Sequence, residues 1–189
     1  MNDSTPPSPP AWLQKARSHW QHSGTRRPDF ARTPGPGEES VWDYPRPPAL
    51  VDDSREVIVR VHGVEIARTR RARRILETAS PPTFYLPPED VRRDLLIPAP
   101  GQSFCEWKGP ASYWTVAVDD TRIESAAWTY PKPFGEFAGI AGWYAFYPGK
   151  VDCLVDDQQV RPQAGGFYGG WVTDEIIGPY KGEPGTGGW

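Results

Sequence analysis

The sequence predicts a mainly β protein that folds as one compact domain with a few short helices. Of its 189 residues, 23 are Pro and 19 are Gly. Both residue types interrupt helices, which excludes a long-helix bundle or a coiled coil. Aromatic residues make up 13% of the chain, whereas disordered segments are poor in them. Apolar and polar residues alternate in several short runs, which is typical of half-buried strands.

Composition also limits the classes of partner and the compartment. The formal net charge of −3 argues against general binding to nucleic acid or to an anionic membrane. No apolar run approaches the length that spans a bilayer, and the N-terminus lacks the pattern of a signal peptide. Cys105 and Cys153 are too few for a disulfide framework. We therefore expect a cytoplasmic protein with reduced thiols.

The chain divides into three segments. Residues 1–40 form a Pro-rich arm, mostly extended, with a short helix over residues 11–22. Residues 41–160 carry the β pattern. Residues 161–189 form a Gly-rich tail in which aromatic residues recur, and exposing these rings would leave large apolar areas in water. We expect three rings of the tail to dock on the domain: Trp171, Tyr180 and Trp189.

The first half of the β pattern begins with alternating valines from Val57, and His62–Val64 supplies the turn of a hairpin. The basic stretch over residues 68–77 fits a short helix. A strand follows at residues 84–86, and Glu89 and Asp90 then open a helical turn.

The second half repeats this plan. Residues 113–118 and 121–127 predict a hairpin, residues 135–142 a short helix and residues 143–147 a strand. A last hairpin is expected over residues 151–160. The sequence therefore predicts two pseudo-symmetric hairpin–helix–strand units that share one core.

Charged motifs in the chain favour solvated turns and faces over a metal or phosphate site. Pairs of Asp at 52–53, 119–120 and 156–157 each follow a Val, and Asp is a favoured turn residue. No Walker-type glycine loop and no zinc-like spacing of Cys and His is present, so no cofactor and no metal is expected. The arginines of residues 68–74 lack interleaved aromatics, which favours a face paired with Glu65 and Glu77 over a nucleic-acid site.

Cys105-Glu-Trp-Lys108-Gly is the most chemically suggestive motif. An ammonium near a thiol can lower the thiol pKa and create a nucleophile. The motif follows Pro100-Gly101, which places it in a loop before a strand. The alternative is a buried Cys105 that acts as a small apolar residue beside a solvated Lys108.

The motif Trp-x-Tyr-Pro occurs twice and is followed each time by a cationic residue and a Pro. We call the two copies the Trp42 corner and the Trp128 corner. Trp42-x-Tyr-Pro ends in Arg46-Pro, and Trp128-x-Tyr-Pro ends in Lys132-Pro. One interpretation is that both corners terminate strands and fill the core. The other is an aromatic wall, with Arg46 and Lys132 facing a ligand.

Several blocks of sequence together resemble a known family. The blocks are Trp42-x-Tyr-Pro-x-Pro-Pro, Pro82-x-Phe-Tyr-x-Pro-x-Glu-Asp-Val91, Cys105-x-x-Lys-Gly109 with Ala111-x-Tyr-Trp114, and Ala127-Trp-x-Tyr-Pro131. From Trp42 to Asp157 the chain resembles domain-of-unknown-function family 427, sometimes labelled nucleotidyltransferase-like. The Trp-terminated tail is similar to a long, actinobacterial-type version. The resemblance implies a compact β-rich domain and no settled activity.

These features favour a site for a small anionic or carbonyl-bearing molecule, whether enzymatic or only binding. We expect Cys105 and Lys108 at its edge as the reactive pair, and Arg46 or Lys132 as further counter-charge. The expected aromatic lining is Tyr113, Trp114, Trp128 and Tyr130. The alternative is a non-catalytic module in which the arm and tail recruit a protein partner or form a homodimer.

Overall fold

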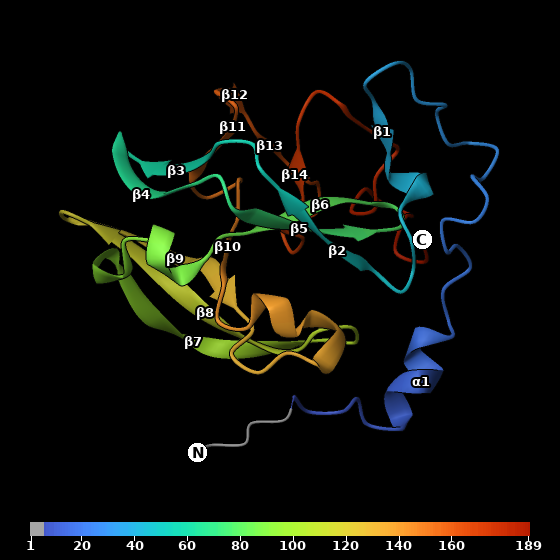
Figure 1. The fold of residues 1–189 in the computed structure, drawn as a ribbon, viewed down its shortest axis with the longest axis horizontal. Helices are drawn as coiled ribbons and strands as arrows, with labels where there is room; N and C mark the ends of the chain where they lie inside the picture. Colours follow the sequence, from blue (N-terminus) through green and yellow to red (C-terminus); the bar gives the residue numbers. More distant parts are fainter. Residues whose placement is uncertain (1–5) are drawn as a thin grey trace.

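A computed structural model describes residues 6–189 and shows a mainly β protein, as the sequence predicts (Figure 1). None of its helices in this range is long and apolar enough to cross a membrane. The helical elements are α1 (Trp12–Arg17) and four 3-10 helices, η1 (Val41–Asp43), η2 (Pro88–Asp90), η3 (Arg93–Leu95) and η4 (Gly135–Ile140). The strands are β1 (Glu39–Ser40), β2 (Ala49–Asp53), β3 (Val57–Val61), β4 (Val64–Thr69), β5 (Ala72–Glu77), β6 (Ser80–Tyr85), β7 (Leu96–Cys105), β8 (Gly109–Val118), β9 (Thr121–Thr129), β10 (Tyr144–Phe146), β11 (Asp152–Val155), β12 (Gln158–Gln159), β13 (Arg161–Pro162), β14 (Trp171–Val172) and β15 (Ile176–Ile177).

Three antiparallel sheets build the domain. Their strand orders are β10-β9-β8-β7, β12-β11-β3-β4 and β2-β5-β6. A bridge between Leu86 and Tyr144 connects the end of β6 to β10. The sheet of β7–β10 lies below the other two in Figure 1, and the core fills the space between them.

The core divides into a large aliphatic cluster and an aromatic one. The aliphatic cluster joins β3, β4, β8 and β11 through residues such as Val59, Ile66 and Val116, all fully buried. The aromatic cluster surrounds Tyr85, Trp128 and Tyr130 at the other end of β6 and β9. The second cluster therefore brings aromatic side chains to one end of the domain.

Both expected hairpins are present. β3 and β4 are joined at His62-Gly63, and β8 and β9 at Asp119-Asp120. His62, Gly63 and Asp119 have positive φ, a conformation that Gly and Asp tolerate well. The hairpin β11–β12 is present too, whereas the internal symmetry of the two units stays a prediction.

The expected short helix over residues 68–77 is wrong, because this stretch ends β4 and then forms β5, the central strand of its sheet. Its arginines are satisfied by carboxylates on neighbouring segments. Arg73 lies opposite Asp52 and binds it at 2.9 Å, and Arg74 binds Asp53 at 3.0 Å. Such cross-strand pairs stabilise a strand that its own composition does not favour. The Asp52-Asp53 pair therefore ends β2 and is not a solvated turn.

Strand β7 was not expected, because Pro98, Pro100 and Gly101 interrupt its pattern. β7 lies at the edge of its sheet and pairs only with β8. An edge strand tolerates Pro, since half of its backbone N–H groups have no ladder partner. Cys105 is therefore the last residue of a strand, and the expected loop is reduced to a tight turn at Glu106–Lys108.

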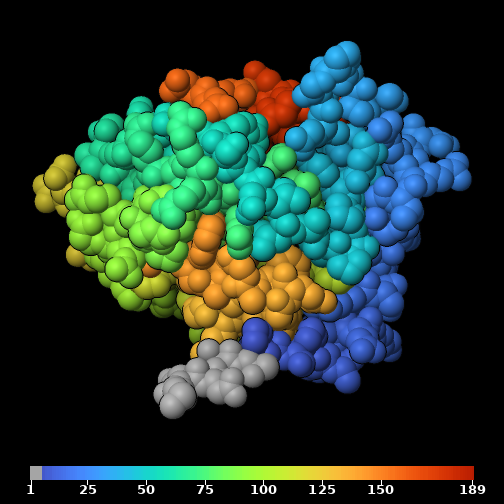
Figure 2. Space-filling view, viewed as in Figure 1, coloured from blue at the N-terminus to red at the C-terminus, as the bar shows by residue number. Residues whose placement is uncertain are grey.

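The arm runs along one side of the molecule (Figures 1 and 2), and the tail ends on the same side (Figure 1). β1 of the arm pairs in parallel with β15 of the tail. Trp171 of the tail is fully buried, while Tyr180 and Trp189 are half-buried against a cluster that surrounds Trp42. The Trp189 ring stacks on Phe30 with centroids 4.9 Å apart.

Deleting residues 178–189 should lower the melting temperature by several degrees. The deletion removes Trp189 from its contacts with Phe30 and Trp42, and exposed aromatic area is unfavourable in water. Differential scanning calorimetry of the full and truncated chains measures the effect. Equal melting temperatures would show that the docked tail adds nothing to stability.

A buried ion-pair network should make stability depend on pH. Arg55 binds Asp53 at 2.7 Å and Glu175 of the tail. Burial alone would raise the pKa of both carboxyl groups, but the hydrogen bonds they accept hold their pKa values below the usual 3.8 and 4.5. Groups with a lowered folded-state pKa stabilise the protein above their unfolded pKa, and this contribution is lost as pH falls through the folded-state values.

The free energy of unfolding should therefore drop as pH falls from about 5 to below 4. Arg55→Met should lower stability at pH 7 and flatten this dependence. Urea unfolding at several pH values measures both. Arg161→Met is the matched control, because its partner Asp174 is exposed and such pairs contribute little. An unchanged pH slope in Arg55→Met would contradict the assignment.

Candidate functional site

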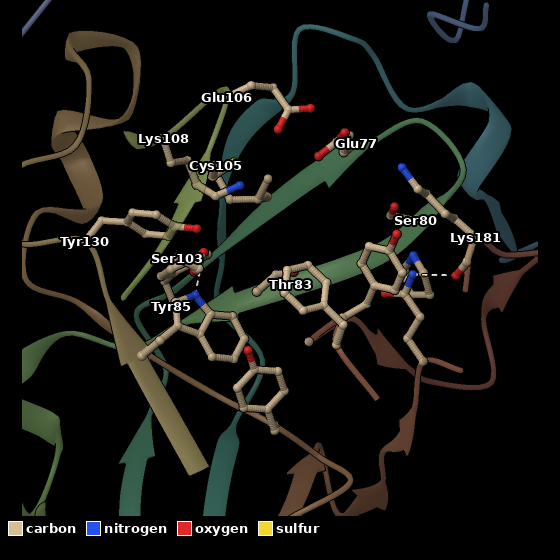
Figure 3. Close-up of a pocket in the computed structure, with 18 of the residues that line it drawn as sticks. Glu77, Ser80, Thr83, Tyr85, Ser103, Cys105, Glu106, Lys108, Tyr130 and Lys181 are labelled. Atoms are coloured by element: carbon tan, nitrogen blue, oxygen red, sulfur yellow. Dashed lines mark hydrogen bonds between the residues drawn. The ribbon is translucent and has the colours of Figure 1, made fainter. Parts of the chain in front are cut away.

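A cavity of about 300 Å³ opens where β5, β6, the β7–β8 turn and the tail meet (Figure 3). Its wall combines aromatic rings with hydroxyl, ammonium and carboxylate groups. The lining residues are Trp20, Ile75, Glu77, Ser80, Pro81, Thr83, Tyr85, Ser103, Phe104, Cys105, Glu106, Lys108, Tyr113, Trp128, Tyr130, Tyr147, Gln163, Phe167, Tyr168, Gly169 and Lys181.

Strand periodicity decides which side chains enter the cavity. Along β6, Pro81, Thr83 and Tyr85 line it, because alternate residues of a strand share one face. On β8, Tyr113 faces the cavity and its neighbour Trp114 faces away. The Trp114 indole donates a hydrogen bond to Thr129 at 3.1 Å and packs against Tyr144.

Lys108 is a buried charged group of the cavity wall. Its residue is only 8% exposed, and its ammonium lies 5.6 Å from the Tyr130 ring centroid and 5.8 Å from that of Phe137. It forms no salt bridge within residues 6–189. Burial lowers the pKa of Lys108, but the neighbouring Cys105, Tyr85 and Glu77 raise it above its ordinary value overall. The side chain is therefore a cation at neutral pH.

The tyrosines around Lys108 remain protonated at neutral pH. Burial raises the pKa of Tyr85 to about 12 and that of Tyr130 well above its usual value. The Tyr85 hydroxyl accepts a hydrogen bond from the Trp128 indole at 3.4 Å, which leaves its own O–H free to donate. The Tyr113 hydroxyl donates a hydrogen bond to the Ser103 hydroxyl at 2.7 Å. The inner wall is thus a set of neutral donors around one cation.

The mouth of the cavity carries charges of both signs. In Figure 3, Lys181 lies on the side opposite Lys108, with Ser80 and Thr83 of β6 between them. The Lys181 ammonium sits 3.9 Å from the centroid of the Trp20 ring, and burial lowers its pKa. Glu77 and Glu106 complete the rim. The mouth therefore carries charges of both signs, whereas Lys108 has no carboxylate within salt-bridge distance in residues 6–189.

The structure brings five of the predicted site residues to this cavity and leaves three outside. Lining it are Cys105, Lys108, Tyr113, Trp128 and Tyr130. Trp114, Arg46 and Lys132 do not line it.

The outlying residues have physical reasons for their positions. Trp114 lies on the opposite face of β8. Lys132 is exposed after β9, and Arg46 is buried where it binds Glu77 at 3.3 Å and the Thr78 carbonyl at 2.8 Å. The Trp42 corner fills the core, whereas the Trp128 corner does line the cavity, so the two similar corners serve different purposes.

Sequence reasoning missed Tyr85, Tyr147 and Lys181 as cavity residues. Tyr85 belonged to a strand that was expected, but the face it presents depends on the register of β5 and β6. Lys181 is a single cation in a Gly-rich tail, and only the tail's return path brings it to the cavity. Within the described part of the chain, no three His, Cys, Asp or Glu side chains gather in a way that could hold a metal ion.

Comparison with known proteins places the central part of the chain in a family. None of the curated proteins matches this chain. A family model described as a domain of unknown function, DUF427, matches residues 49–157, which is more than half of the sequence. The matched region includes Cys105, Lys108 and Tyr130, whereas Trp20 and Lys181 come from outside it. The chain belongs to the DUF427 family.

Proposed function

We propose that the cavity binds a small organic anion, or a carbonyl-bearing metabolite, with its charged or polar oxygen at Lys108. The observation that carries this proposal is the buried ammonium of Lys108, which has no carboxylate partner within residues 6–189. A buried charge is costly unless it is paired. An anionic ligand supplies the missing partner.

The hydroxyl groups around Lys108 support the same ligand chemistry. The phenols of Tyr85 and Tyr130 stay protonated at neutral pH and can donate hydrogen bonds to an oxygen. Hydrogen bonds to a charged acceptor are stronger than neutral ones. An oxygen placed between Lys108 and these phenols would therefore receive several charge-assisted hydrogen bonds.

The remaining wall favours a flat or apolar ligand body. The rings of Trp128 and Tyr147 pack against each other at a tilt of 44°, with centroids 4.4 Å apart, and both line the cavity. The cavity volume of about 300 Å³ lies at the lower end of the range for small-molecule sites. The ligand class is thus a small monoanion with an apolar body.

The Cys105 thiol gives this site a route to chemistry. It lines the cavity next to Lys108 and is half-buried, whereas Cys153 is fully buried. With Lys108 binding the oxygen of a carbonyl group, the Cys105 sulfur beside it could act as the nucleophile that attacks the carbonyl carbon. Binding alone requires only Lys108 and the phenols, so the two roles are separable by experiment.

The alternative function, recruitment of a protein partner or a second copy, is supported less. It requires a free arm and tail, but Trp20 and Lys181 pack on each other and Trp189 packs on Phe30 of the arm. These contacts use the aromatic groups within the chain itself.

Lys108→Met should weaken binding of benzoate at least about tenfold, because the substitution keeps the shape of the side chain and removes its charge. Isothermal titration calorimetry measures the affinity, and benzyl alcohol serves as a neutral ligand of similar shape. Lys132→Met is the matched control, since this lysine is exposed and outside the cavity. Equal affinities for benzoate and benzyl alcohol, or equal losses in both variants, would contradict the proposal.

A bound anion should slow alkylation of Cys105 by iodoacetamide. Ligand and thiol share one cavity, so occupancy blocks access, while the buried Cys153 reports global unfolding. Mass spectrometry of the two cysteine peptides gives both rates at increasing benzoate concentration. If benzoate binds and the Cys105 rate stays constant, the thiol lies outside the ligand site.

A further inference from the structure

A second cavity lies between the arm and the DUF427 domain, and it shares only Trp20 with the lining of the first cavity. Its volume is about 360 Å³. Arg17, Trp20 and His22 of the arm form one wall, and Arg46 and Trp107 form the other. The remaining lining residues are Gln14, Ser18, Ser23 and Pro47.

Three side chains of this cavity hold hydrogen-bond donors with no acceptor. The indole N–H groups of Trp20 and Trp107 and the Nε–H of Arg46 are buried and bind nothing in the described part of the chain. Trp107 is 3% exposed and the Arg46 side chain 2%. Buried donors without partners are rare and unfavourable, and each one calls for an explanation. In the described part of the chain, the first cavity contains only one of these donors, that of Trp20.

The charges around this cavity are mainly positive. The cavity lining contains two arginines and neither Asp nor Glu. Arg46 is balanced by Glu77 at 3.3 Å from outside the lining. Arg17 lies over the Trp107 ring at 4.8 Å, and its only carboxylate neighbour in residues 6–189 is the exposed Glu136 at 3.7 Å. The Arg17 charge is therefore only weakly compensated.

We infer that this cavity is a binding site for a small oxyanion, a phosphate or a carboxylate group. An oxyanion accepts hydrogen bonds through several lone pairs at once. It also carries the negative charge that would balance the Arg17 guanidinium. Guanidinium groups match the geometry of both anions, and indole N–H groups are donors only. One oxyanion thus meets both deficits of the cavity, the unpaired donors and the uncompensated charge.

Binding at this site is coupled to the seating of the arm. The three donor atoms are covered by neighbouring atoms in this structure. Binding therefore includes a shift of the arm side chains Trp20 or Arg17, after which the ligand connects the arm to the domain. Arg17 already bonds the Glu106 carbonyl at 2.9 Å. A ligand that binds the docked arm stabilises it by mass action.

Titration of the full chain with inorganic phosphate, and separately with acetate, tests the site at constant ionic strength. We expect saturable binding of at least one of the two ions by calorimetry, and the tighter ion identifies the chemical source. Arg17→Gln and Trp107→Phe should each weaken it about tenfold, because each removes a donor to a charged acceptor. Phosphate or acetate should also slow trypsin cleavage after Arg26 of the arm in the wild-type chain.

Two controls distinguish this site from other effects. Arg92→Gln removes an exposed arginine that pairs with Asp94 and should retain the affinity within twofold. Lys108→Met removes the cation of the first cavity, so binding that is lost only in this variant belongs to that cavity and not to the second one. The affinity of Trp107→Phe is interpreted only if this variant has the circular dichroism spectrum of the wild type. Arg17→Gln tests the site independently of Trp107. Binding of neither ion, equal losses in Arg92→Gln, or loss in Lys108→Met alone would overturn the inference.

Discussion

The burial of the Lys108 ammonium is the constraint around which this end of the molecule is arranged. An ammonium removed from water is strongly unfavourable, and no carboxylate within the described chain forms a salt bridge with it. The structure stabilises the charge with the ring faces of Tyr130 and Phe137 and with the nearby Glu77. Each of these groups comes from a different segment of the chain. The position of Lys108 therefore depends on the packing of several elements at once.

The arm and tail complete the environment of that charge although they contain little regular structure. Trp20 of the arm lies between two cations, with Arg46 4.2 Å and Lys181 3.9 Å from its ring centroid. The backbone ladders of the arm and tail are only two residues long, β1 with β15 and β13 with β14, so side-chain contacts of this kind add to them in holding the segments in place. The Arg55–Glu175 pair and the stacking of Trp189 on Phe30 act in the same way. Closure of the cavity thus rests on charge and stacking, while the three sheets rest on apolar burial.

The sequence predicts the parts of this fold that are local. The hairpins at His62–Gly63 and Asp119–Asp120 follow from alternating apolar residues and turn residues, and the mainly β class follows from the Pro, Gly and aromatic content. The sequence does not show that residues 72–77 form a strand, because their partners Asp52, Asp53 and Glu39 are distant in the chain. Strand β7 is not predicted either, because Pro98 and Pro100 disfavour a strand. Both prolines are tolerated only because β7 lies at the edge of its sheet, and this position depends on the tertiary structure.

The candidate site shows the same division. The Cys105–Lys108 motif and the Trp128–Tyr130 corner were visible as sequence blocks, and the structure places both at one cavity. Whether Tyr113 or Trp114 faces that cavity depends on the face of β8, which periodicity alone leaves open. Arg46 was expected beside a ligand, but it lies behind the first cavity and lines the second. The contribution of Lys181 depends entirely on the return path of the tail.

Measuring the protonation of the Lys108 side chain, and its response to an anion, tests most directly whether the first cavity is an anion site built around a buried cation. Heteronuclear magnetic resonance of lysine-labelled protein can follow the Lys108 side chain through a pH titration, with and without benzoate. The structure predicts that Lys108 stays protonated above pH 10.5, its ordinary pKa, and that benzoate shifts its resonance and not that of Lys132. A Lys108 resonance that titrates below pH 10.5 and ignores benzoate would show that the cavity is not an anion site.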